Sequence, residues 1–249
     1  DGNPLLDEER LQAYDLAVDD IARRGGYRDG AAEFALRSTI DDQHRCRASG
    51  RSSVDSLGAH LSLDSLTVTA ASSDWALTRP ARFDFGGDRI QVENFEITSA
   101  QGRVTAHGVI DRRGQQSCRL GMQGVGRDML RARMGRTDTH GVLGGSFSLA
   151  GPAAAPTGSG AIRVDVAVAE RPAGQLRSDL AWDGTRLDLR GGVVTAEQDS
   201  LTWAGQLPLA FSLAPADSAG DARSVRGLEG PGDMRLAADR FPLRAFSPF

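Results

Sequence analysis

The chain repeats itself: residues 83–110 align with residues 180–207 without a gap, and Gly108 and Gly205 mark the spacing of 97 positions. The aligned pairs are Phe83 with Leu180, Phe85 with Trp182, Gly87 with Gly184, Arg89 with Arg186, Ile90 with Leu187, Val92 with Leu189, Ile97 with Val194, Thr98 with Thr195, Val104 with Leu201, Gly108 with Gly205 and Ile110 with Leu207. Within each copy apolar residues occupy every second position, the period of a β-strand with one apolar face. Such a repeat predicts stacked β units and an extended binding surface in preference to a single catalytic pocket.

Composition favours a β-rich chain and argues against several classes of protein. Of the 249 residues, 40% are hydrophobic and 25% are charged, which is too apolar for a disordered tail. Aromatic residues make up only 6% and glycines number 30, a balance typical of many short strands joined by frequent turns. The net charge of −4 gives no general electrostatic attraction to nucleic acid.

Strand-like alternation runs from Tyr27 almost to the end of the chain. Between Leu63 and Leu66 the apolar positions change phase by one residue, which predicts a β-bulge or a tight turn. Residues 86–88 (GGD) and 113–115 (RGQ) predict hairpin turns. Loop-like breaks are expected at residues 124–136, 151–160 and 214–232.

The first part of the chain is ambiguous, because residues 7–26 fit both a helix and a strand. The strands that follow favour a strand there as well. No leader and no apolar run long enough to cross a membrane is present, and no composition break marks a domain linker. We therefore expect residues 1–249 to be a fragment of a longer β-repeat protein, with any targeting segment upstream.

Short motifs recur in a fixed order along the chain. They are WALTRPA at 75–81, IQVENF at 90–95, GRVTAHGVI at 102–110, GSFSLAGPAAAP at 145–156, GQLPL at 205–209 and ADRFPL at 238–243. Over roughly residues 55–249 this order resembles the TamB/AsmA-like family of envelope proteins.

The resemblance implies an all-β fold: a long sheet of antiparallel or parallel strands, folded lengthwise into a trough (a β-taco), polar outside and apolar inside. About 18 strands spaced ~4.8 Å apart would give a trough of roughly 80 Å. The implied function is that of a periplasmic bridge that carries phospholipid to the outer membrane and supports outer-membrane biogenesis. The parent protein would be anchored in the inner membrane and would have an outer-membrane barrel of the BamA or TamA type as its partner. The family implies no catalytic residue and no cofactor.

The alternating apolar residues are the candidate lining of such a trough. They are Leu66, Val68, Phe83, Phe85, Ile90, Val92, Phe95, Ile97, Val104, Ile110, Phe147, Leu149, Ile162, Val164, Val166, Leu187, Leu189, Leu201 and Trp203. The alternative is that the same residues form the filled core of a β-sandwich, because alternating strands commonly pack against a second sheet.

Four arginines, Arg127, Arg131, Arg133 and Arg136, are candidates to hold phosphate headgroups at the rim of the trough. A solvated loop in which they pair with Asp128 and Asp138 is the alternative.

Other reactive residues form no recognisable site. Cys46 and Cys118 could form a disulfide in an oxidising compartment or remain as two buried thiols. His44 lies near Cys46, but two groups do not make a metal site. Adjacent carboxylates such as Asp41 and Asp42 point to opposite faces of a strand, and no hydrolase elbow, P-loop or dinucleotide motif is present.

Three other functions remain open alongside lipid transport. A scaffold for outer-membrane protein assembly would offer its strand edges to client strands. A secreted β-repeat adhesin would expose polar or aromatic recognition patches. A β-helix carbohydrate enzyme would need carboxylates that converge in a cleft.

Overall fold

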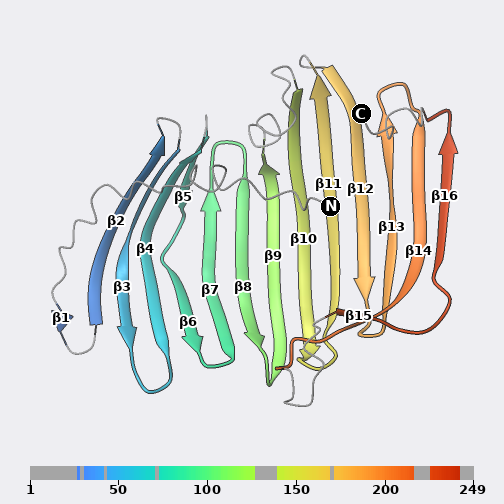
Figure 1. Cartoon of the computed structure of the whole chain (residues 1–249). Helices are drawn as coiled ribbons and strands as arrows, with labels where there is room; N and C mark the ends of the chain where they lie inside the picture. Colours follow the sequence, from blue (N-terminus) through green and yellow to red (C-terminus); the bar gives the residue numbers. More distant parts are fainter. Residues whose placement is uncertain are drawn as a thin grey trace, which may run out of the picture.

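The computed structural model describes residues 27–28, 31–41, 44–70, 73–126, 139–168, 171–215 and 225–241. In these ranges the chain is all-β, with sixteen strands in one sheet and no helix. The predicted strand or helix at residues 7–26 lies outside the described residues. The sheet is open, and its strands lie side by side from the two-residue strand β1, beside β2, at one edge to β16 at the other (Figure 1).

The strands are β1 (Tyr27–Arg28), β2 (Ala31–Asp41), β3 (His44–Val54), β4 (Ala59–Ala70), β5 (Ser73–Leu77), β6 (Ala81–Gly86), β7 (Arg89–Thr98) and β8 (Arg103–Asp111). They continue as β9 (Gln115–Val125), β10 (Thr139–Pro152), β11 (Thr157–Val168), β12 (Arg171–Trp182), β13 (Arg186–Thr195), β14 (Ser200–Phe211), β15 (Val225–Gly227) and β16 (Asp233–Asp239).

The topology is a meander in which chain neighbours are sheet neighbours. Strands β5 and β6 share the space between β4 and β7, and strands β15 and β16 both pair with β14. Every named strand pair is antiparallel, so the parallel pairing that the sequence left open does not occur between the described strands. Short hairpin turns are sufficient for this order, because antiparallel neighbours need no crossover.

The turns lie where the sequence predicted them. Residues 87–88 connect β6 to β7, and Gly87 adopts a φ of 50°, a left-handed conformation that glycine reaches without steric cost. Residues 112–114 connect β8 to β9. The predicted break at 151–160 is narrower than expected, because β10 and β11 extend into it and leave only residues 153–156 as the turn.

The predicted bulge in β4 is confirmed. Strand β3 pairs Gly50 with Leu63 but Ser49 with Ser65, so β4 has one extra residue at this point. The extra residue keeps Leu63 and Leu66 on the same face of the sheet despite their odd spacing.

Buried side chains are few among the described residues. Leu63 on β4 and Ala81 on β6 lie opposite each other and form one buried pair, and the others gather near the β10–β11 turn, at the lower ends of these strands in Figure 1. Leu149, Ala153 and Pro156 are buried around the turn from β10 to β11, and Gln116 is 2% exposed beside them. The amide of Ala153 donates a hydrogen bond to the carbonyl oxygen of Gly114 in the neighbouring turn (2.9 Å). The described part of the sheet therefore has a small local core at one end.

Candidate functional site

One face of the sheet is apolar from edge to edge. Residues paired directly across antiparallel strands share a face, so the register can be followed along the sheet. One such row links Ile97, Val104, Met122, Gly145, Ile162, Ser178, Gly191, Trp203 and Leu236. A parallel row links Phe95, Ala106, Leu120, Phe147, Gly160, Leu180, Leu189, Gly205 and Met234. We call the face that carries these two rows the apolar face.

All nineteen candidate lining residues lie on the apolar face when the register is followed through the bulges. Other large residues of the same face were not among the candidates. They are Phe34, Leu36, Leu61, Leu63, Trp75, Leu77, Leu120, Met122, Val125, Leu143, Leu176, Leu180, Trp182, Val193, Leu207, Met234 and Leu236. The same period of two would have identified most of them within their own strands. Leu61 and Leu63 are out of phase with Leu66, and Val125 is out of phase with Met122, so only the register places these three on the apolar face.

In the part of the chain that the structure describes, no second sheet or helix covers the apolar face. Phe85, Ile90, Phe147 and Ile162 are between 39% and 44% exposed, and Leu149 is the one candidate that is fully buried. A filled sandwich core would bury such residues. An uncovered apolar surface of this extent is typical of a binding surface.

Several aromatic rings lie against glycines of nearby strands and turns. A Cβ atom on Gly191 would lie 2.6 Å from the ring of Trp203, and one on Gly102 would lie 2.6 Å from the ring of Trp75. A Cβ on Gly160 would lie 3.3 Å from the ring of Phe147. The missing side chains thus leave space for rings to pack against the neighbouring strand, as in the aromatic rescue of glycines in designed sheets.

The two cysteines also lie on the apolar face, and both are free thiols. Cys46 on β3 and Cys118 on β9 are separated by the strands β4 to β8, so they cannot form a disulfide within this sheet. Both are half-buried. Burial raises the pKa of the Cys118 thiol, as expected for a thiol among apolar side chains.

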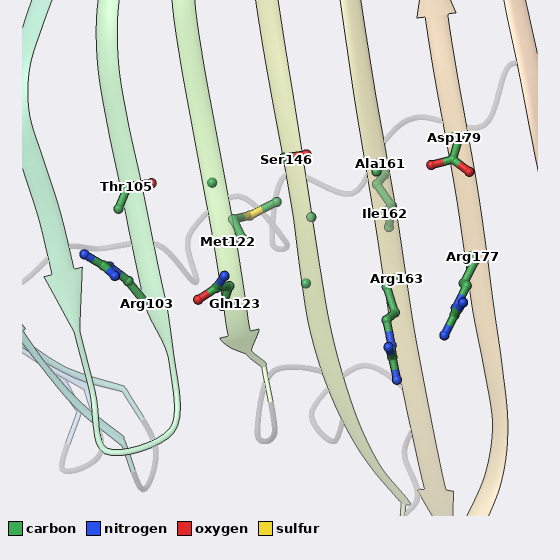
Figure 2. A pocket seen from close by; sticks show the side chains of 13 residues that line it. Arg103, Thr105, Met122, Gln123, Ser146, Ala161, Ile162, Arg163, Arg177 and Asp179 are labelled. Atoms are coloured by element: carbon green, nitrogen blue, oxygen red, sulfur yellow. The ribbon is translucent and has the colours of Figure 1, made fainter.

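The opposite, polar face carries a shallow hollow of about 660 Å³. Figure 2 shows Arg103, Arg163, Arg177 and Asp179 around it, on strands β8, β11 and β12. Gly121 and Gly144 lie at its floor, where side chains would otherwise fill the space.

The charges in this hollow are balanced within the protein. Arg103 donates to the carboxylate of Glu96 (2.7 Å), and Arg163 pairs with Asp165 (2.8 Å). The hydrogen bond from Arg103 lowers the pKa of Glu96, and the one from Arg163, together with nearby Arg177, lowers the pKa of Asp165. The hollow therefore offers little free positive charge to an anionic ligand.

The remaining candidates add no site within the described ranges. Arg127, Arg131, Arg133 and Arg136 lie outside the described residues, so their role as headgroup ligands stays a prediction. Among the described residues no three His, Cys, Asp or Glu side chains are placed to hold a metal ion. The same ranges contain no helix long and apolar enough to cross a membrane.

The apolar face, uncovered and continuous across the described strands, is therefore the candidate functional site. Comparison of the chain with protein-family models, with curated proteins and with solved structures gives no match.

Proposed function

We propose that this chain is a non-enzymatic segment of a trough that shields the acyl chains of phospholipid from water. The observation that carries the proposal is the apolar face, which extends across the described strands and is covered by no second sheet or helix there. Each exposed CH₂ group costs about 0.8 kcal/mol, so a 16-carbon chain costs on the order of 10 kcal/mol in water. A continuous apolar surface offsets most of this cost at every position along a path.

The family resemblance extends the proposal to the whole protein. We propose that the sheet curves lengthwise into a trough and forms part of a periplasmic bridge. The parent protein would be anchored in the inner membrane and would act with an outer-membrane barrel of the BamA or TamA type. The motif order between residues 75 and 243 supports this assignment.

Lipid that co-purifies with the protein tests the proposal. The protein is purified under mild conditions and analysed by native mass spectrometry beside two double variants. Phe147→Asp with Ile162→Asp places two carboxylates on the apolar face. Ser148→Asp with Ala161→Asp places two carboxylates on the polar face of the same two strands, at the same stagger.

We expect phospholipid on the parent and on the polar-face variant, and at least a tenfold loss on the apolar-face variant, because unpaired carboxylates are costly among acyl chains. Circular dichroism checks that all three proteins are folded. A folded parent without lipid contradicts the proposal, and so does equal lipid on both double variants.

A second function is favoured by the exposed strand at one edge of the sheet. Every residue of β16 is exposed, and Met234 and Leu236 are 49% and 69% exposed. Unpaired edges can accept a further strand. If the parent binds no lipid, binding of unfolded outer-membrane barrel peptides to this edge becomes the next test.

A further inference from the structure

The lower part of β14 turns away from β13 and crosses the lower ends of neighbouring strands (Figure 1). We call residues 209–213 the rim strap. The amide of Leu209 donates to the carbonyl oxygen of Thr185 (2.9 Å), and the amide of Leu213 donates to that of Ala153 (2.8 Å). The rim strap is thereby attached to the β12–β13 turn at one end and the β10–β11 turn at the other.

Beneath the rim strap lies Trp182, the last residue of β12. It pairs with Gly158 and Leu187 and therefore belongs to the apolar face. Its ring packs on Phe211 of the rim strap, with ring centroids 4.7 Å apart and an angle of 56° between the ring planes. The rim strap thus covers the apolar face at its lower rim, next to the small buried core.

The indole N–H of Trp182 is the unusual feature of this contact. The Nε1 atom is shielded from solvent and has no hydrogen-bond acceptor among the described residues. A buried donor without an acceptor destabilises the fold, and such groups in native proteins call for an explanation. Both residues of this contact are followed by polar residues, because Asp183 comes after Trp182 and Ser212 after Phe211 in the chain.

This position matches the border between the apolar and polar parts of a phospholipid. Trp is favoured where one side of the ring meets hydrocarbon and its N–H meets polar groups, as at membrane interfaces. The first acceptors beyond the acyl chains of a diacyl phospholipid are the ester carbonyl oxygens at the glycerol. An acyl chain on the apolar face would place these oxygens at the rim where β12 ends.

We propose that Trp182 donates its indole N–H to an ester carbonyl oxygen of a bound phospholipid, and that the rim strap lifts from Trp182 to admit it. This inference rests on the proposed function, since it names how the same apolar face holds the polar end of its ligand. It makes Trp182 a residue that selects ester-linked lipid.

The test compares two lipids that differ only in the carbonyl groups. Dimyristoyl phosphatidylcholine has two ester carbonyls, and its ditetradecyl ether analogue has none. Binding of each lipid from small vesicles is measured for the parent, for Trp182→Phe and for Trp203→Phe. Both substitutions keep an aromatic ring on the apolar face and remove only the N–H donor with part of the ring.

We expect Trp182→Phe to weaken binding of the ester lipid by roughly 2- to 10-fold, the value of one hydrogen bond, and to leave binding of the ether lipid nearly unchanged. Trp203→Phe should affect both lipids equally. The chain has three tryptophans, so protein labelled with ¹⁵N at the indole gives three resonances. The Trp182 resonance should shift downfield with the ester lipid alone.

Each other outcome has a distinct meaning. If the parent binds neither lipid, the proposed function itself fails. If the parent binds both lipids, but Trp182→Phe weakens them equally, Trp182 contributes ring packing and the proposed hydrogen bond is wrong. An indole resonance of Trp182 that is insensitive to bound ester lipid likewise overturns the inference while the lipid-binding function stands.

Discussion

The two copies of the repeat fold into the same hairpins, but the first copy has one extra residue in its strand pairing. Strand β7 of the first copy and strand β13 of the second begin and end at aligned residues. Near the hairpin turn their registers coincide, since Val92 pairs with Gly108 in one copy and Leu189 with Gly205 in the other.

Beyond that point only the first copy has a bulge. In β7, Glu93 and Asn94 lie between two successive pairs where β8 supplies only His107. Asn94 adopts a φ of 57°, a left-handed conformation that Asn tolerates better than most residues. The second copy continues as a regular ladder to the pair of Val194 with Ser200.

The bulge changes which side of the sheet the aligned residues occupy. Ile97 follows the bulge and lies on the apolar face. Val194, its aligned counterpart, lies on the polar face and is 39% exposed, while Val193 lies on the apolar face instead. Aligned residues of a sequence repeat can therefore lie on opposite faces of the sheet. Which residues form the apolar face depends on where each strand has its extra residue.

Deletion of one residue from each copy should give the largest difference in stability between the two copies. Deletion of Asp188 from the regular ladder moves Leu189 to the polar face and Arg190 to the apolar face. We expect a loss of about 2–4 kcal/mol or more in the free energy of unfolding. Deletion of Asn94 instead pairs Glu93 with His107 and leaves Phe95 opposite Ala106, at a cost within about 1 kcal/mol.

Urea denaturation followed by circular dichroism measures both deletions beside the parent. The strand on each side of Asn94 keeps its pairing partners after that deletion, so the comparison isolates the register from the mere loss of a residue. Equal destabilisation by the two deletions would show that the bulge does not absorb the extra residue.

The sequence predicts this register wherever a bulge shifts the alternation of apolar residues by one position. The bulge in β4 was predicted because Leu63 and Leu66 are out of phase. The same signal separates Val92 from Phe95, and it would have revealed the bulge at Asn94. Alternation alone thus assigns most residues of the apolar face correctly.

The rim strap, in contrast, left no such signal in the sequence. It is held over the end of β12 by the hydrogen bond from Leu213 to Ala153, and these two residues lie far apart in the chain. A local period of apolar residues does not encode a contact of that kind. Whether a second layer covers the apolar face is likewise a property of how the strands are ordered, and hairpins of the same pattern can form sandwiches as well as open sheets.

The aligned glycines Gly108 and Gly205 should show the next largest difference between the two copies. Gly108 has a φ of 120°, and a Cβ atom there would overlap the carbonyl oxygen of Ser117. A Cβ on Gly205 would lie 2.5 Å from the carbonyl oxygen of Asp233 and 2.6 Å from the sulfur of Met234, both on the edge strand β16. The edge strand can shift, whereas β9 is held between β8 and β10.

We therefore expect Gly108→Ala to destabilise the protein more than Gly205→Ala does. Backbone strain at a positive φ alone costs on the order of 1–3 kcal/mol for a residue with a Cβ atom. Thermal denaturation of the two variants gives the comparison directly. A larger effect of Gly205→Ala would mean that β16 is held more firmly than its exposure indicates.

The smallest expected difference concerns pH and involves Asp84 of the first copy. His60 on β4 lies between two carboxylates: its Nδ1 is 2.6 Å from Asp84 of β6, and its Nε2 is 3.2 Å from Asp55. The hydrogen bond to Asp84 has the largest effect and the one to Asp55 the next largest, and both raise the pKa of His60. On β3 its partner is the uncharged Ser53, and the counterpart of Asp84 in the second copy is Ala181.

A raised pKa in the folded state means that the protonated imidazole stabilises the fold. That contribution is complete below the unfolded pKa of about 6.5 and is lost as the pH rises through the higher folded pKa. The difference in urea midpoint between the parent and His60→Asn should therefore be largest near about pH 5.5 and shrink toward about pH 8. Asp188→Asn in the second copy is the matched control, because the charged partner of Asp188 is Arg186 and not a histidine. Its effect should be constant between the two pH values. A His60→Asn difference that is equally constant would show that the two carboxylates do not raise the pKa of His60 in the folded state.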